Sequence, residues 1–120
     1  MANLDKETLM LENYFSAPKT LRRLRAGASG PYIDDFSDAL ERDRYARASA
    51  VRYLRAAAHL GCFVHRKGYV FGNIDEPMLE AFARHLARCR CPLSNGGKTG
   101  YHARFGVKLF YQHLVQHGIC

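Results

Sequence analysis

Three residues in the second half of the sequence have side chains that bind metal ions: His85, Cys89 and Cys91. Imidazole and thiolate groups are the ligands that Zn²⁺ prefers, but a structural zinc site uses four of them. Cys62 and His102 are the remaining candidates, and neither belongs to a recognisable second pair of ligands. A zinc site stays open as an interpretation, beside ordinary cysteines near a helix end. On balance the pattern predicts no metal and no other cofactor.

Basic residues are concentrated in the later part of the chain, which carries a net charge of +7 over 120 residues. Residues 1–43 hold six Lys/Arg against eight Asp/Glu, whereas residues 44–120 hold twelve against three. From Ala81 onward the sequence has no acidic residue. A basic field on one part of a small domain attracts polyanions, so the charge favours nucleic acid as a partner over a merely solvated surface.

One row of basic side chains falls on a helix that we expect over residues 49–67. At about 100° per residue, its members share a narrow arc with no carboxylate among them. They are Arg52, Arg55, His59 and Arg66. Neighbouring guanidinium groups repel one another unless an anion sits opposite, and their planar forks suit phosphates and guanine edges. We therefore expect these residues to contact DNA, with a solvated helix face as the alternative.

A second row of polar and basic side chains falls on a helix expected over residues 101–117. Arg104, Lys108 and Gln112 follow one another at a spacing of i, i+4, i+8. Lys98 stands just ahead of this helix in a glycine-rich loop, where backbone amides also suit a phosphate. These four residues complete the predicted DNA-binding set.

Helix signals dominate the sequence and predict an all-α fold. Val and Ile are scarce, and no run of them reads as a buried strand. The helices expected in the main domain are 32–44, 49–67 between Ser49 and Gly68, 75–88 opened by Asp75 and Pro77, and 101–117 before Gly118. The breaker AGASGP at residues 26–31 separates an N-terminal extension, residues 1–29 with short helices near 5–14 and 18–25, from this compact four-helix domain, residues 30–120.

Apolar residues at helical spacing predict the core of this domain. They are Ile33, Phe36 and Leu40 in the first helix, Ala50, Tyr53, Leu54, Ala57, Leu60, Gly61 and Val64 in the second, and Ala103, Val107, Phe110 and Leu114 in the fourth. Phe105 and Leu109 form a further apolar strip, which either packs inside the domain or contacts a missing neighbour.

No stretch approaches the roughly 20 apolar residues of a membrane span, and no signal sequence opens the chain. We expect a cytoplasmic protein with reduced cysteines and no membrane partner.

The order of these residues carries a resemblance to a known family. The core-binding, SAM-like N-terminal domain of bacterial tyrosine recombinases (phage integrases) resembles the segment GPYIDDFSDALERDRYARASAVRYLRAAAHLGCFVHRKG. The matching positions are Gly30–Ile33, Tyr45, Ser49, Val51, Tyr53, Leu54, His59 and Leu60. The third and fourth helices of that domain resemble NIDEPMLEAFARHLARCRCP and FGVKLFYQHLVQHGI. The resemblance covers about residues 30–119.

This resemblance implies a domain that grips one face of duplex DNA at a recombination site during DNA integration, together with other recombinase protomers. In that family the second and fourth helices face the DNA, and a separate C-terminal domain cuts it with a tyrosine. His85 and Arg88 fit the catalytic His-x-x-Arg pattern by spelling alone, inside a helix of the binding domain. We therefore expect no catalytic residue and no catalytic domain in this chain, and hence no enzyme activity. The alternative is a helical protein-interaction module, or a small DNA-binding regulator with no recombinase role.

Overall fold

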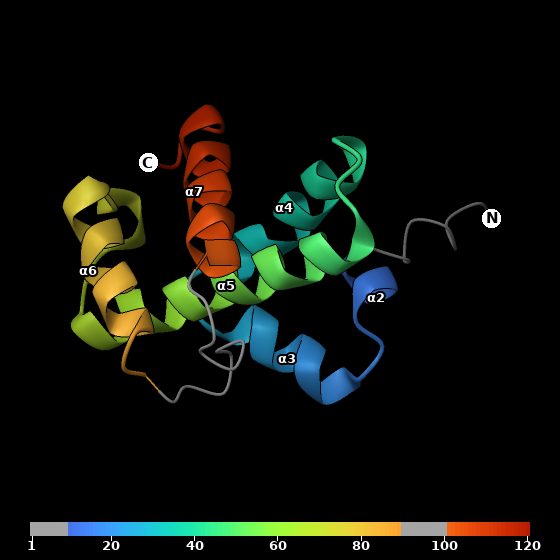
Figure 1. Ribbon diagram of the computed structural model, residues 1–120, viewed down its shortest axis with the longest axis horizontal. Coiled ribbons are helices and arrows are strands. Elements are labelled where there is room, and N and C mark those ends of the chain that lie inside the picture. Colours follow the sequence, from blue (N-terminus) through green and yellow to red (C-terminus); the bar gives the residue numbers. More distant parts are fainter. Residues whose placement is uncertain (1–9, 90–100) are drawn as a thin grey trace.

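Helix α5 (Arg47–Lys67) crosses the middle of the molecule, and the other helices pack around it (Figure 1). The computed structural model describes residues 10–89 and 101–120. Over those ranges the chain forms helices and no strand, which confirms the all-α prediction. The remaining elements are α2 (Met10–Tyr14), α3 (Pro18–Ala26), α4 (Gly30–Arg42), the 3₁₀ turn η1 (Phe71–Asn73), α6 (Glu76–Leu86) and α7 (Tyr101–Gln116).

The predicted apolar faces form the core. Every residue expected on the core face of α5 is buried, and so are the predicted core positions of α4 and α7. Burial on α5 extends further round the helix, because Ala56, Ala58 and Phe63 are also covered. The centre of α5 is therefore enclosed on nearly all sides, and exposed side chains are left mainly near its two ends.

Two glycines allow the backbones around α5 to approach closely. A Cβ placed on Gly61 would lie 2.6 Å from the backbone nitrogen of Ser29, at the junction of α3 and α4. A Cβ on Gly106 would lie 2.8 Å from Tyr53 Cα, where α7 stands on α5 in Figure 1. Any larger residue at either position would push these elements apart.

Helices α4, α5 and α7 end in the same hydrogen-bonded motif. A residue just past each helix takes the left-handed region: Gly68, directly after α5, and Gly118, two residues after α7, both with φ 74°, and Arg44, two residues after α4, with φ 64°. The next amide then donates to a carbonyl five residues back, as in Tyr69 N to Val64 O at 3.1 Å. The prediction of Gly68 and Gly118 as helix ends is confirmed. The end expected for the first helix at Arg44 is two residues late, because a non-glycine residue takes the left-handed position there.

Two predicted helix starts differ from the structure. Helix α4 begins at Gly30 instead of residue 32, since Pro31 is tolerated in a first turn. Helix α5 begins at Arg47, and its N-cap is Ala46, so the prediction of Ser49 as N-cap is wrong. In contrast, Asp75 caps α6 as predicted, because its Oδ1 accepts a hydrogen bond from the Met78 amide at 3.1 Å.

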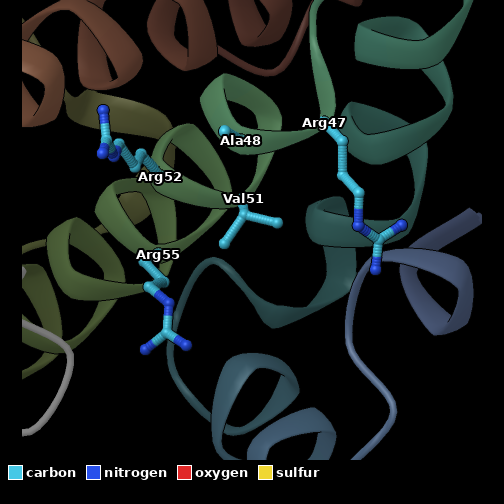
Figure 2. A pocket seen from close by; sticks show the side chains of 5 residues that line it. All are labelled: Arg47, Ala48, Val51, Arg52 and Arg55. Atoms are coloured by element: carbon cyan, nitrogen blue, oxygen red, sulfur yellow. The ribbon is translucent and has the colours of Figure 1, made fainter.

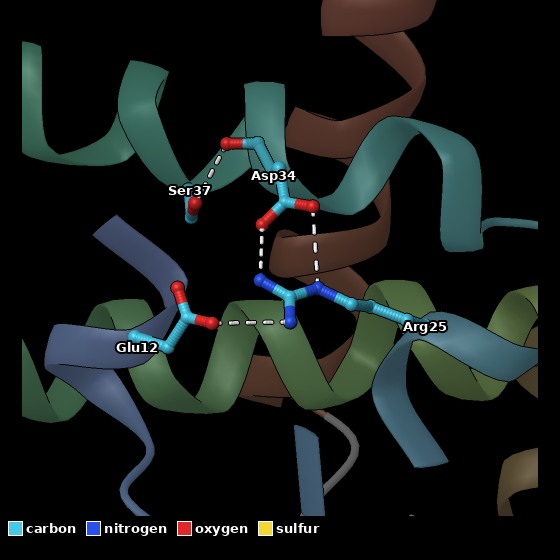
Figure 3. A network of polar contacts seen from close by, with 4 residues as sticks. All are labelled: Glu12, Arg25, Asp34 and Ser37. Carbon is cyan, nitrogen blue, oxygen red and sulfur yellow. Dashed lines mark hydrogen bonds and ion pairs between the residues drawn. The ribbon is translucent and has the colours of Figure 1, made fainter. Parts of the chain in front are cut away.

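The short helices of the N-terminal extension pack on the rest of the molecule. Leu11, Phe15 and Leu24 are buried in the same core as the residues of α4 and α5. An ion-pair network reinforces this contact (Figure 3), because Arg25 on α3 donates to Asp34 on α4 through Nη2 at 2.7 Å and through Nε at 3.2 Å. The same guanidinium reaches Glu12 on α2 at 3.4 Å, so one arginine joins three helices.

None of the helices that the structure describes is both long enough and apolar enough to cross a membrane.

Candidate nucleic-acid interface

Three arginines lie together on the first turns of α5. Arg47, Arg52 and Arg55 line an open hollow of about 490 Å³ with the small side chains of Ala48 and Val51 (Figure 2). Arg52 and Arg55 are neighbours on the helix surface, because they are three residues apart, and Arg47 lies about two turns before Arg55. Among the residues that the structure describes, no carboxylate lines the hollow. We call Arg47, Arg52 and Arg55 the arginine patch.

Residues of the N-terminal extension hold two members of the arginine patch in place. Arg47 donates through Nη1 to the Asn13 carbonyl at 2.8 Å and through Nη2 to the Tyr14 carbonyl at 3.3 Å. The guanidinium of Arg55 lies over the Phe15 ring, 5.4 Å from its centre. Because the guanidinium groups of Arg47 and Arg55 are already held in place, these side chains lose less conformational freedom when they bind an anion. These contacts therefore preorganise the patch.

Arg52 is an exposed member of the arginine patch, as is Arg47, whereas Arg55 is half-buried. Arg52 forms no hydrogen bond or ion pair with any other residue that the structure describes, and Figure 2 shows it pointing away from Arg47. Arg47 itself is missing from the predicted set, because the helix was expected to begin only at Ser49. Its spacing in the sequence could have indicated its place. Arg47 stands four residues before Val51 and eight before Arg55, which is the spacing of residues along one side of a helix.

The prediction that His59 contacts DNA is wrong, because this side chain is only 2% exposed. Helix α6 packs over it, with the rings of Phe82 and His85 centred 5.0 and 5.3 Å from the imidazole. Burial, with smaller contributions from His85 and Arg66, lowers the pKa of His59 to about 4. The imidazole is therefore neutral near neutral pH and belongs to the interior.

The buried centre of α5 also divides the predicted basic row. Arg66 is exposed as expected, but it lies 14 residues after Arg52, or about 21 Å further along the helix axis. The helical wheel placed both residues on one continuous surface stripe. A helical wheel treats every position along a helix as equally accessible to solvent. In the structure, α6 covers the middle of α5, at His59, so the stripe is interrupted there. Arg66 is therefore not part of the arginine patch.

The row on α7 is exposed as predicted, with one correction to its electrostatic setting. Arg104, Lys108 and Gln112 line a groove of about 550 Å³ between α6 and α7. Glu76 and Glu80 of α6 line the same groove. The row is thus free of carboxylates along its own helix but not across the groove, although no ion pair joins the two sides within the described residues.

The structure also places the candidate metal ligands. His85 and Cys89 meet at the end of α6, and the third group beside them is the buried His59, which the sequence did not associate with them. Cys89 Sγ lies 3.5 Å from His59 Nε2. Cys91 and Lys98 lie outside the residues that the structure describes.

A family model adds an independent observation. The phage integrase SAM-like domain matches residues 30–111, more than half of the 120-residue chain. The chain belongs to the phage integrase SAM-like domain family. No curated protein and no solved structure matches it. The matched segment contains the arginine patch and, from the row on α7, Arg104 and Lys108, while Gln112 lies one residue beyond it. Helices α2 and α3 precede it.

Proposed function

We propose that this integrase SAM-like domain binds duplex DNA and serves as the DNA-gripping half of a site-specific tyrosine recombinase. The arginine patch is the observation that carries the proposal. Three arginines border one hollow on α5, none of the described residues that line it is a carboxylate, and two of the guanidinium groups are held in position by other parts of the chain. A phosphate backbone is the partner whose charge and spacing such a surface suits.

The row on α7 extends this surface in the proposal. Arg104 and Lys108 would contact phosphates, and the exposed amide of Gln112 could read a base edge through paired donor and acceptor atoms. Glu76 and Glu80 across the groove would repel phosphates placed too close to α6. These two glutamates would therefore limit DNA to the side of α7 that faces away from α6.

Binding is the whole of the proposed role, and strand cleavage is not part of it. The one His-x-x-Arg pattern, at His85 and Arg88, stands at the end of α6. The His85 ring packs against other rings there, 5.1 Å from Phe63 and 5.3 Å from His59 between centroids. These contacts favour a packing role for His85 over a catalytic one.

A salt titration of DNA binding tests the proposal. If Arg47, Arg52, Arg55, Arg104 and Lys108 each neutralise one phosphate, log Kd should rise with log salt with a slope of about 4.5. Replacing one exposed arginine on each helix, as in the double variant Arg52→Gln/Arg104→Gln, should weaken binding and reduce the slope by about 1.8.

The matched control is Arg22→Gln/Arg23→Gln, which removes the same charge from exposed positions on α3. This pair should leave the slope nearly unchanged. An equal loss of affinity from both double variants would reject the proposed surface, and binding insensitive to salt would reject the phosphate contacts altogether.

A protein-interaction module is the second candidate, supported by one observation. Phe105 is 38% exposed beside the groove, although its ring still contacts Tyr53 at 5.5 Å. Leu109, which the sequence grouped with Phe105, is half-buried. An interaction module would require neither Arg52 nor Arg104 and no DNA, so a folded chain that does not bind DNA at low salt would favour this second candidate.

A further inference from the structure

Three side chains that bind transition metals meet where the end of α6 lies against α5. His85 is in the last turn of α6, and the Cys89 amide donates to its carbonyl at 3.0 Å. This bond continues the helical path for one more turn, so Cys89 follows His85 on the same face. His59 enters from α5, and one ligand atom from each of the three residues lies within 4.8 Å of the others.

We propose that His59, His85 and Cys89 bind one transition metal ion of the Zn²⁺ class. Zn²⁺ binds nitrogen at about 2.1 Å and sulfur at about 2.3 Å, so two such ligands of a tetrahedral ion are about 3.5 Å apart. His59 Nε2 and Cys89 Sγ are separated by 3.5 Å. The cluster offers nitrogen and sulfur and no carboxylate, which selects Zn²⁺-like ions over Mg²⁺ or Ca²⁺.

The fourth coordination position lies outside these three residues. Three protein ligands with an open position are a familiar arrangement for Zn²⁺, and water fills the remaining place. Cys91 lies outside the described residues and is not used in this inference.

The surroundings of the cluster suit a metal ligand set. His59 is only 2% exposed, and the lowered pKa that follows from burial keeps its imidazole neutral, which is the form that coordinates a metal. The rings of Phe63 and Phe82 pack on the two imidazoles and restrict their movement. An apolar shell of this kind orients ligands and controls the access of water.

Charge balance makes the cysteine the decisive ligand. On metal binding the Cys89 thiol releases its proton to solvent, and the thiolate offsets one of the two positive charges of the ion. Burial, with smaller contributions from the charges of Arg66 and Lys67, lowers the pKa of His85, and these two positive charges oppose a bound cation. A site with two neutral imidazoles alone would bind poorly in this field.

The ion would fasten α6 to α5. Among the described residues, α6 contacts α5 mainly through aromatic rings, such as Phe82 on Phe63 at 5.4 Å between centroids. A metal bound by both helices would add a directional link at the end of α6. Because α6 supplies Glu76 and Glu80 to the groove beside α7, metal binding would also fix the acidic side of that groove. This inference does not depend on DNA binding.

Titration of the metal-free full chain with Co²⁺ under anaerobic conditions tests the site. A tetrahedral cobalt ion with one thiolate ligand gives a sulfur-to-metal charge-transfer band and strong visible bands, and Zn²⁺ should displace it in a one-to-one ratio. Replacing a direct ligand should weaken binding by at least about 10–100-fold, the loss seen for residues that only support a ligand. Cys89→Ser should abolish the charge-transfer band, and His85→Gln should weaken Co²⁺ binding by at least that factor.

Cys62→Ser is the matched control, because Cys62 is a half-buried cysteine on α5 that does not belong to the cluster. This variant should keep the band and the affinity of the unmodified chain. Far-ultraviolet circular dichroism of each variant without metal establishes that it is folded. A titration without a charge-transfer band, or a band that survives in Cys89→Ser, would overturn the proposal.

Discussion

Replacing Gly61 by alanine would test a close backbone contact between α5 and the junction of α3 and α4. The added methyl group would lie 2.3 Å from Ser29 Oγ and 2.6 Å from the Ser29 backbone nitrogen. Non-bonded atoms of these types pack at about 3.5 Å or more, so the junction of α3 and α4 must move by about 1 Å. A backbone nitrogen cannot rotate aside as a flexible side chain can. The strain therefore falls on both helices.

Two opposing effects set the change in the free energy of unfolding that Gly61→Ala should cause. Overpacking of this kind costs about 2–3 kcal/mol, while alanine is favoured over glycine inside a helix by about 1 kcal/mol. We expect the free energy of unfolding to fall by about 1–2 kcal/mol. For a chain of this length, that loss lowers the melting temperature by about 4–8 °C.

Thermal unfolding followed by circular dichroism measures this change, and Gly27→Ala is its control. Gly27 belongs to the same junction, but a Cβ there would meet Cys62 at an ordinary 3.4 Å, and φ is −82°. The control should keep its stability or gain up to about 1 kcal/mol. A Gly61→Ala variant that melts at or above the temperature of the unmodified chain would refute the close approach.

Two further predictions concern buried polar groups. Ser29 Oγ is buried and has no hydrogen-bond partner among the residues that the structure describes, so Ser29→Ala should raise the free energy of unfolding by about 1 kcal/mol; a lower denaturant midpoint would contradict this. His113 is buried, and its pKa lies below 6.5 because burial and the charges of His117 and Arg42 outweigh Asp35. The unfolded chain therefore takes up a proton first, so stability is full above about pH 6.5 and falls as the pH drops below it. His113→Gln should flatten this part of the pH–stability curve, and an unchanged slope would contradict the assignment.

Helical periodicity in the sequence was enough to predict core positions on α4, α5 and α7, but not the part of the core that the N-terminal extension and α6 supply. The positions expected on the buried faces of α4, α5 and α7 are all buried, because the spacing of apolar residues along one helix already specifies which face turns inward. Glycine likewise predicted the ends of α5 and α7, since few other residues adopt a positive φ easily.

Contacts between elements could not be predicted in the same way. His59 occupies a basic arc of its own helix, yet the ring of Phe82, 23 positions later in the chain, covers it. Glu76 and Glu80 stand opposite α7 only after α6 has packed. Arg47 was missed because the helix start was misplaced by two residues. In each case the missing information was the position of another helix or the conformation of one turn.

The contacts of Arg47 and Arg55 have a consequence for how this family can diversify. The carbonyls of Asn13 and Tyr14 and the ring of Phe15, which hold these arginines, all precede the segment shared with the phage integrase SAM-like domain. Two members with the same family segment but different N-terminal arms would present the same arginines at different angles. If these arginines bind DNA as proposed, differences in binding specificity would then arise from the N-terminal residues. A sequence comparison limited to the shared domain would not detect them.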